Sequence, residues 1–343
     1  MSVSALPFDP TIYLSLAFFF GIAAQFRAMD GYTFLRRVLA AIEPRVGMVY
    51  AVAIVTFVFS PFILNDVLVL ILTPALIRYA KHYGLDAAPL IVAEITFTNI
   101  SSSLTPIGNP QNILLWTSSR ISFVGFVQGT WVLVFASAGI ATVALIPLAR
   151  MFGGPRDPES SLGGFGPAYY LALVTVTVLA SDALGLGLVS YVPLGVAFLL
   201  GFIFNSRNLS QLKREFDVRS LLILYLFIAS VTVAAYFLTP YLTKYVVPAA
   251  MGNQPYSGVF LAVASNLISN VPATQLLINS AGVSASVAPK IAVEAGLAGN
   301  LGPIASFANL LALQMAARSG VSVRRMLLLQ VGVGLLAFIP ALF

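Results

Sequence analysis

Apolar stretches long enough to cross a lipid bilayer follow one another along almost the whole chain. Of the 343 residues, 59% are hydrophobic and only 9% are charged, whereas a soluble domain averages about 45–50% apolar and about 25% charged residues. A transmembrane helix needs about 20 consecutive apolar residues. The sequence therefore predicts an all-α polytopic membrane protein, and it excludes an ordinary soluble enzyme, a disordered chain and a fibrous one.

The chain lacks the residues on which much catalytic and metal chemistry depends. It has no cysteine and a single histidine, His82, which excludes disulfides and thiolate metal sites and makes a histidine-ligated metal unexpected. No Ser–His or Cys–His set supports an intramembrane enzyme. The net charge of +6 is accounted for by basic cytoplasmic loops, so no nucleic-acid partner is expected. We expect no cofactor and no metal apart from Na+ as a coupling ion. The expected partners are the lipid bilayer and a small ion.

Hydropathy divides the chain into full spans, interrupted spans and hairpins. Each hairpin has two apolar arms of about 15 residues, or about 22 Å of helix, against about 30 Å of hydrocarbon. We therefore expect both hairpins to be re-entrant. Two longer stretches contain Pro, Gly, Asn and Ser in mid-course and are predicted to be broken transmembrane helices. The predicted elements are spans at 11–26, 122–148, 164–181, 187–205, 220–238 and 325–343, hairpins at 46–84 and 254–284, and broken helices at 87–118 and 286–316.

The two halves of the chain resemble each other. Residues 1–148 form the first half and residues 164–343 the second, joined by a polar linker at 149–163. At both hairpin tips a Ser is followed five residues later by an Asn, and TPIGNPQNILL in the first broken helix pairs with GPIASFANLLA in the second. The hairpins are expected to enter from opposite faces, so the repeats are inverted. Inverted repeats with broken helices are typical of secondary transporters.

Basic residues give the orientation. With the first hairpin entering from the cytoplasm, only Arg120, Lys244 and Lys290 of the 18 Lys and Arg residues fall outside. This distribution obeys the positive-inside rule and places the N-terminus outside. We expect a multi-pass protein of the cell (plasma) membrane. Residues 27–45 mix arginine with apolar residues and predict an amphipathic helix on the cytoplasmic surface.

Polar residues gather at the hairpin tips and at the helix breaks. A break exposes backbone groups that lipid cannot satisfy, so breaks persist where they line a cavity. Freed carbonyls suit a cation and half-helix N-termini suit an anion, while hydroxyl and amide oxygens suit a hard cation such as Na+. The candidate binding residues are Ser60, Asn65, Asp66, Thr105, Gly108, Asn109 and Asn112 in the first half and Ser265, Asn266, Ser269, Asn270, Thr274, Asn300, Gly302, Ser306 and Asn309 in the second, with Asn99 and Ser101 to Ser103 beside them.

Three carboxylates are predicted to lie at membrane depth and are candidates for proton coupling: Asp66, Glu94 and Glu294. A buried carboxylate costs several kcal/mol unless it is paired, metal-bound or protonated. Asp66 stands at a hairpin tip, which favours a functional role. Glu94 and Glu294 have the alternative of acting as hydrogen-bond partners of the broken helices, and Lys290 lies one helical turn before Glu294 as an ion-pair partner.

Three motifs carry a resemblance to a known group of transporters. NDVLVLILTP (65–74), SSLTPIGNPQNILLW (102–116) and SNLISNVPATQLL (265–277) resemble the ion transporter superfamily of arsenite permeases, one class of Na+/H+ antiporters, citrate transporters and divalent anion–sodium symporters. They are most similar to the arsenite-permease-like branch. The resemblance implies an elevator-type carrier with a moving transport domain and a scaffold that is often a homodimer. Neither tip carries the Ser-Asn-Thr of the sodium-coupled symporters, and Asp66 places a negative charge there.

The leading hypothesis is a secondary active transporter of a small anion, an arsenite-like oxyanion or a carboxylate, coupled to H+ or Na+. The close alternative is a Na+/H+ antiporter, in which Asp66 binds Na+ and H+ in turn. A channel, in which both hairpins line one pore, is a further alternative.

Overall fold

The computed structural model describes residues 10–152, 166–183, 191–205, 209–216 and 256–343, together with scattered positions between 218 and 240. Every regular element in the described part of the chain is a helix, which confirms the all-α prediction. The expected span at 220–238 falls largely outside the described residues, as does the linker beyond Phe152.

In the first half, helices follow the predicted order of span, hairpin, broken helix and span. In the sequence, helix α2 lies between the first span and the hairpin. The helices are α1 (Pro10–Ala28), α2 (Gly31–Val46), α3 (Met48–Phe59), α4 (Asn65–His82), α5 (Ala88–Ser101), a 3-10 turn at Ser102–Leu104, α6 (Pro110–Ser119), α7 (Phe123–Ala144) and α8 (Ile146–Met151). Helix α8 continues α7 after a turn at Leu145, so the first residues of the expected linker are helical.

The second half repeats the hairpin and the broken helix. Its helices are α9 (Gly166–Ala183), α10 (Tyr191–Asn205), α11 (Leu209–Glu215), α14 (Tyr256–Ile268), α15 (Asn270–Ala281), α16 (Ala288–Ala298), a 3-10 turn at Gly299–Leu301, α17 (Phe307–Arg318), α18 (Val323–Phe338) and a final 3-10 turn at Ile339–Leu342.

Helix lengths separate full spans from shorter arms. Within the described residues, the stretches Phe123–Met151 and Val323–Leu342 are long and apolar enough to cross a membrane. Three of the four hairpin arms have only 12 or 13 residues, or about 18–20 Å of helix at 1.5 Å per residue. The fourth arm, α4, has 18 residues. The three short arms fall below the about 20 residues that a full membrane span needs.

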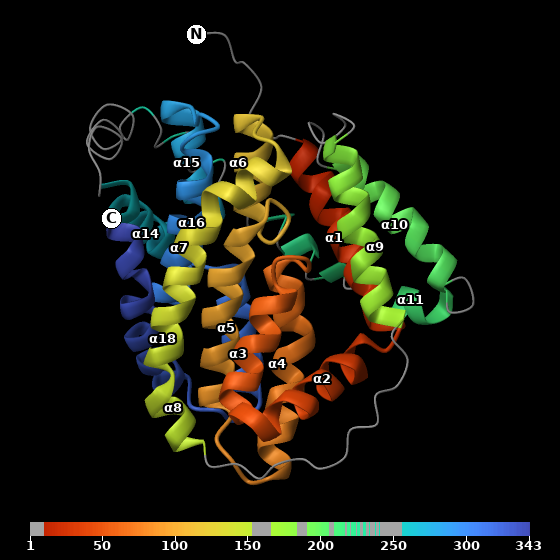
Figure 1. Ribbon diagram of the computed structural model, residues 1–343, viewed down its shortest axis with the longest axis vertical. Coiled ribbons are helices and arrows are strands. Elements are labelled where there is room, and N and C mark those ends of the chain that lie inside the picture. The colour runs from red at the N-terminus through yellow and green to blue at the C-terminus, as the bar shows by residue number, and fades with distance from the viewer. Residues whose placement is uncertain are drawn as a thin grey trace.

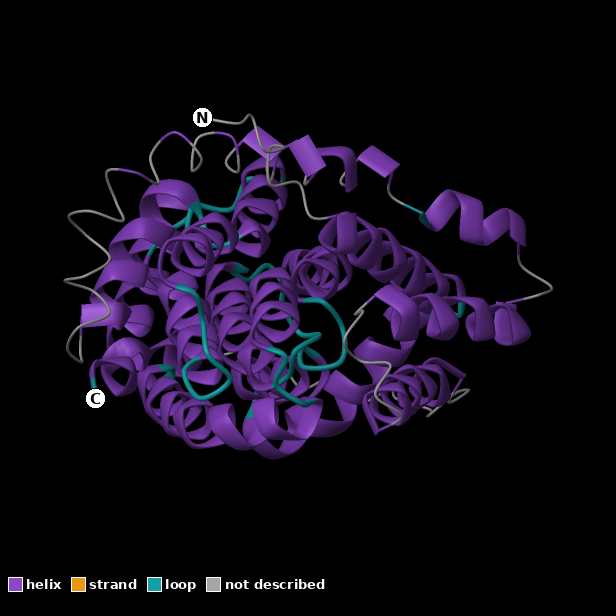
Figure 2. Ribbon diagram, turned by 90° about the horizontal axis from the view of Figure 1, so that it is seen from above, coloured by secondary structure: helices purple, strands orange, loops and turns teal. Residues whose placement is uncertain are grey.

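The helices form two bundles (Figure 1). Helix α1 packs against α9, α10 and α11 on one side, and the hairpins, the broken helices, α7 and α18 form the larger body. The small bundle is closely packed, because a Cβ on Gly21 of α1 would lie 2.5 Å from the ring of Phe198 in α10. Helix α2 connects the two bundles. Seen from above, many helices appear nearly end-on (Figure 2), since they share one general direction.

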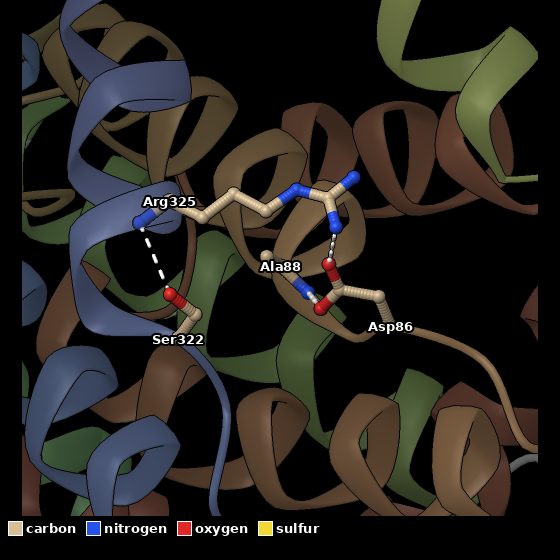
Figure 3. Close-up of polar contacts among 4 residues, drawn as sticks. All are labelled: Asp86, Ala88, Ser322 and Arg325. Atoms are coloured by element: carbon tan, nitrogen blue, oxygen red, sulfur yellow. Dashed lines mark hydrogen bonds and ion pairs between the residues drawn. The ribbon is translucent and has the colours of Figure 1, made fainter.

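An ion pair joins the loop after α4 to the last long helix (Figure 3). Asp86 accepts a hydrogen bond from the backbone N–H of Ala88 at 2.9 Å and thereby caps the start of α5. The same carboxylate lies 2.7 Å from a guanidinium nitrogen of Arg325, and Ser322 caps α18 through the Arg325 N–H. Both side chains of the pair are partly exposed, so the pair fixes geometry more than it adds stability.

Candidate functional site

The helices α5 and α16 are each continued, after a break, by a second short helix. Following its 3-10 turn the chain becomes extended at Thr105 and again at Asn109 before α6 begins at Pro110. In the second half it is extended at Gly302 and at Ser306 before α17 begins. These breaks lie where the sequence predicts them, and each leaves backbone groups that the helix itself cannot pair.

Each hairpin tip is hydrogen-bonded to the break in its own half. The backbone N–H of Asn65, the first residue of α4, donates to the carbonyl of Gly108 at 3.0 Å. The backbone N–H of Asn270, the first residue of α15, donates to the carbonyl of Ala305 at 2.9 Å. Gly108 and Ala305 occupy the same place in the paired motifs TPIGNPQNILL and GPIASFANLLA. The sequence repeat is therefore also a repeat of structure.

Two asparagines bridge the breaks from the helices that follow. The side-chain amide of Asn112 donates to the carbonyls of Ser102 at 2.9 Å and Thr105 at 2.8 Å. Asn309 donates in the same way to Gly299 at 2.5 Å and Gly302 at 3.0 Å. Both amide nitrogens thus pair carbonyls released by the break. The Asn112 side-chain oxygen has no partner within the described structure.

The two broken helices cross each other at the centre of the larger body. The amide nitrogen of Asn99 in α5 donates to the side-chain oxygens of Asn300 at 2.9 Å and Asn309 at 3.0 Å. At the crossing, a Cβ on Gly296 would lie 1.9 Å from the Ser103 hydroxyl. Gly296 therefore permits an approach that a larger residue would prevent. Sequence reasoning did not single out Gly296, because its requirement for a small residue comes from a helix almost 200 positions away.

The two tips differ in how completely their polar groups are paired. At the first tip the Ser60 hydroxyl donates to Thr98 at 3.2 Å and the Thr105 hydroxyl donates to Pro61 at 2.5 Å. In the second half the buried hydroxyls of Ser265, Thr274 and Ser306 have no partner among the described residues.

The second tip also has unusual backbone geometry. Its turn residue, Ser269, adopts a positive φ of 73°, and Gly302 leaves room for the Asn266 side chain, whose oxygen would lie 2.2 Å from a Cβ there. The unpaired oxygens at the second tip and break are hydroxyls, whereas those at the first tip and break belong to carboxyl and amide groups.

Asp66 connects the two halves. Its side chain is 1% exposed, and its carboxylate accepts a hydrogen bond from the backbone N–H of Ala308, in the first turn of α17. One carboxylate oxygen has no partner in the described structure. A carboxylate of the first half thus lies at the positive end of the broken helix of the second half.

The corresponding position at the other tip carries no charge. Val271 follows Asn270 as Asp66 follows Asn65, and α15 packs beside α6 as α4 packs beside α17. In the first turn of α6 the side chain of Gln111 is fully buried, and neither its oxygen nor its nitrogen has a partner among the described residues. Sequence reasoning missed Gln111, although its place directly after the Pro of the break is a usable signal.

Glu94 and Glu294 lie on the broken helices, away from the tips. Glu94 in α5 accepts a hydrogen bond from Thr73 in α4 at 2.8 Å. Glu294 in α16 accepts one from Ser257 in α14 at 2.9 Å and lies 3.6 Å from the Lys290 ammonium. Both carboxylates therefore tie a broken helix to a hairpin arm. Their role in proton coupling stays a prediction.

The donor set determines which ions the region can hold. The described residues contain no group of three or more acidic or histidine side chains arranged for a metal ion. The tips and breaks instead present hydroxyl, amide and backbone oxygens, one carboxylate, and two half-helix N-termini. Such oxygens suit a hard monovalent cation, and the N-termini suit an anion.

Comparison with known proteins assigns the family. Residues 3–299 match the citrate transporter family. The chain belongs to the citrate transporter family. This membership identifies a membrane transporter rather than an enzyme, and it confirms the resemblance to the ion transporter superfamily.

Relatives of this citrate transporter family member include proteins of a bacterium, a plant and a protist. It is 30% identical to the inner membrane protein YbiR of Escherichia coli (strain K12) over 279 residues, which cover 80% of this chain and 71% of YbiR. It is 35% identical to the silicon efflux transporter LSI3 of Oryza sativa subsp. japonica over 115 residues, 33% of this chain and 24% of that protein. It is also 30% identical to the putative transporter arsB of Dictyostelium discoideum over 95 residues, 28% of this chain and 17% of that protein.

A solved structure has the same fold. The YdaH transporter of Alcanivorax borkumensis superposes with a TM-score of 0.52 at 16% sequence identity, covering 96% of this chain and 83% of the other.

Replacing Gly108 with Ala tests the packing of the first break. The added Cβ would lie 2.2 Å from the backbone carbonyl of Ser102, so the break must shift, at a cost of about 1–3 kcal/mol. Gly139→Ala is the matched control, because no atom lies within 4 Å of its added Cβ. We expect Gly108→Ala to lower the melting temperature and the transport rate, and Gly139→Ala to lower neither. Equal melting temperatures for the two variants would contradict the close packing.

Proposed function

We propose that the protein is a secondary active transporter of a small anion, an inorganic oxyanion or a carboxylate, coupled to H+ or Na+. The observation that carries this proposal is the repeated arrangement in which a hairpin tip is bonded to the break of a neighbouring helix. Such breaks are tolerated at membrane depth where they line a site. The family description, citrate transporter, and the relatives named for silicon efflux and arsB support a small anionic or oxyacid substrate.

The anion is proposed to bind at the start of α6, beside the tip of the second hairpin. Free N–H groups and the positive end of the helix favour negative charge there. Gln111 supplies a buried side-chain amide that has no partner in the described residues. The side-chain nitrogen of Asn270 also has no partner there. Unlike the start of α17, this helix end is not already faced by a carboxylate.

Coupling is proposed to run through Asp66. Its carboxylate faces the start of α17 and retains one unpaired oxygen. A proton or a Na+ ion on Asp66 cancels the buried charge, which allows the body to move through the low-dielectric interior without an uncompensated ion. The unpaired oxygen of Asn112 lies in the same half and is a candidate Na+ ligand, and no other cofactor is proposed.

The movement is proposed to be of the elevator type. The hairpins, entering from opposite faces as re-entrant elements, and the broken helices form the moving body, while α1, α9, α10 and α11 form the scaffold. The short arms and the separation of the two bundles support this division. A homodimer would form through the scaffold. The protein is proposed to lie in the cell membrane with its N-terminus outside.

Na+/H+ antiport is the second candidate, favoured by Asp66. This carboxylate lies at a helix N-terminus where an anionic substrate would otherwise bind. An antiporter would need only Na+ and H+ to alternate on the carboxylate. Saturable counterflow would argue against the channel alternative for either candidate.

Thermal stability of the detergent-purified protein separates the candidates. The additions are NaCl at several pH values, arsenite, silicate, citrate, succinate and sulfate, with choline chloride as the control. A ligand at 100 times its Kd stabilises by about 2.7 kcal/mol. Stabilisation by one anion, stronger with Na+ or at low pH, is expected for the anion transporter. Stabilisation by Na+ alone, growing with pH, would replace that proposal with antiport.

Asp66→Asn tests the coupling role. The substitution removes the charge but keeps the shape and one oxygen that accepts from Ala308, so we expect a normal yield and melting temperature. Accumulation driven by a proton or Na+ gradient in proteoliposomes should be lost. Asp86→Asn, which removes a carboxylate outside the site, is the control and should transport normally. Gradient-driven uptake at the wild-type rate in Asp66→Asn would refute the coupling role.

Distances between spin labels test the elevator. The chain contains no cysteine, so two introduced cysteines carry the only labels. Val176 in α9 and Val263 in α14 are 61% and 57% exposed and report on the scaffold and the moving body. We expect substrate to shift the distribution of distances for this pair and to leave the pair Val176 and Ile203, both within the scaffold, unchanged. Identical distributions for the first pair with and without substrate would argue against a moving body.

A further inference from the structure

A cavity separate from the transport site lies between α2 and the C-terminal half of α4. Its volume is about 350 Å³. Its walls combine apolar residues of α2, α3 and α4, such as Leu39, Met48 and Leu76, with arginine, tyrosine, histidine and glutamate side chains. Nothing in the proposed transport mechanism uses this space.

The polar groups of the cavity are arranged by charge. Arg78 stacks over the ring of Tyr32, with 4.6 Å from the guanidinium carbon to the ring centroid. Arg36 lines the same cavity and, like Arg78, is exposed. Glu43 is 2% exposed, and its carboxylate accepts a hydrogen bond from the Tyr79 hydroxyl at 2.8 Å. The carboxylate of Glu43 is therefore buried and hydrogen-bonded, while the side chains of Arg36 and Arg78 are exposed.

The cavity lies at the end of the molecule that carries most of the basic residues. Helix α4 runs from the hairpin tip to His82, and α2 and α8 lie at the same lower end in Figure 1. By the positive-inside rule this end faces the cytoplasm. Helix α2 combines buried residues, among them Phe34, Leu35 and Leu39, with the exposed Arg36 and Arg45. Such a helix lies in the interface between water and hydrocarbon.

We infer that this cavity binds the phosphate headgroup of an anionic membrane lipid. Two guanidinium groups at one cavity suit a phosphate, because each presents several N–H donors in a fixed plane. The apolar walls suit the glycerol and upper acyl carbons of a lipid rather than a hydrated inorganic ion. The cavity lies next to α2, a basic amphipathic helix of the kind that attracts anionic lipids.

Such a lipid would act on the connection between the two bundles. Helix α2 is the only described element between α1 of the small bundle and α3 of the larger body. A headgroup held by Arg36 of α2 and Arg78 of α4 would fix α2 against the hairpin arm. The lipid is thus placed to stabilise one position of the hairpin relative to α1. This inference rests on the cavity and its charges and does not depend on which ion is transported.

Binding of short-chain lipids to the purified full-length protein tests the inference. The probes are dioctanoyl-phosphatidylglycerol, dioctanoyl-phosphatidylcholine and inorganic phosphate, each titrated against the melting temperature. The variant is Arg36→Gln/Arg78→Gln. The matched control is Arg37→Gln/Arg45→Gln, which removes the same charge from basic residues that do not line the cavity. Arg36→Lys/Arg78→Lys keeps the charge and shows whether the arginines act only through packing.

We expect phosphatidylglycerol to bind the wild type and the control with similar affinity. The glutamine variant should bind about 30-fold more weakly, at about 1 kcal/mol for each basic residue, and the lysine variant should recover only part of this loss, because it keeps the charge without the planar donor set. An equal loss in the control would mean non-specific attraction by surface charge and would overturn the inference. Stabilisation by inorganic phosphate alone would overturn it in favour of a soluble anion. Equal binding of phosphatidylglycerol to all variants would place the lipid elsewhere.

Discussion

The structure depends on how backbone groups are paired where two helices break. Lipid offers no hydrogen-bond partner, so each released carbonyl must find one within the protein. Asn112 and Asn309 supply it from the following helix, and the tips supply N–H donors through Asn65 and Asn270. Because the tip is bonded to the break, hairpin and broken helix form one unit. Each hairpin is therefore proposed to move together with the broken helix of its own half.

The two halves differ in the charge at their hairpin tips. Both tips use the same backbone bond, yet only the first is followed by an acidic residue, Asp66, and that residue faces the start of α17 in the opposite half. At the other helix start the polar group is Gln111, which is neutral. The two halves therefore differ in charge. The start of α17, faced by Asp66, suits an ion that neutralises a carboxylate, and the start of α6 suits an anion.

Much of the fold could be predicted from the sequence, because lengths and polar interruptions are local signals. The breaks at 105–109 and 302–306 and the tips were read from Pro, Gly and Asn in apolar surroundings. The contacts between halves could not be read in this way. The hydrogen bonds from Asn99 to Asn300 and from Ala308 to Asp66 join residues about 200 or more positions apart. The sequence predicts Asn112 as a ligand. In the structure its amide nitrogen also donates hydrogen bonds to two carbonyls of the break.

The position of α2 links the inferred lipid site to the proposed movement. If the larger body moves past α1, the connection between them must bend or slide, and α2 is that connection. Its contacts with the body include two that differ in kind: Phe34 packs on Phe59 near the first tip, and Tyr32 packs under Arg78 near the C-terminal end of α4. The first contact is apolar and lies at the hairpin itself, whereas the second involves an exposed guanidinium that a phosphate can engage. The inferred lipid would therefore change the strength of the second contact with the composition of the membrane and leave the first unchanged.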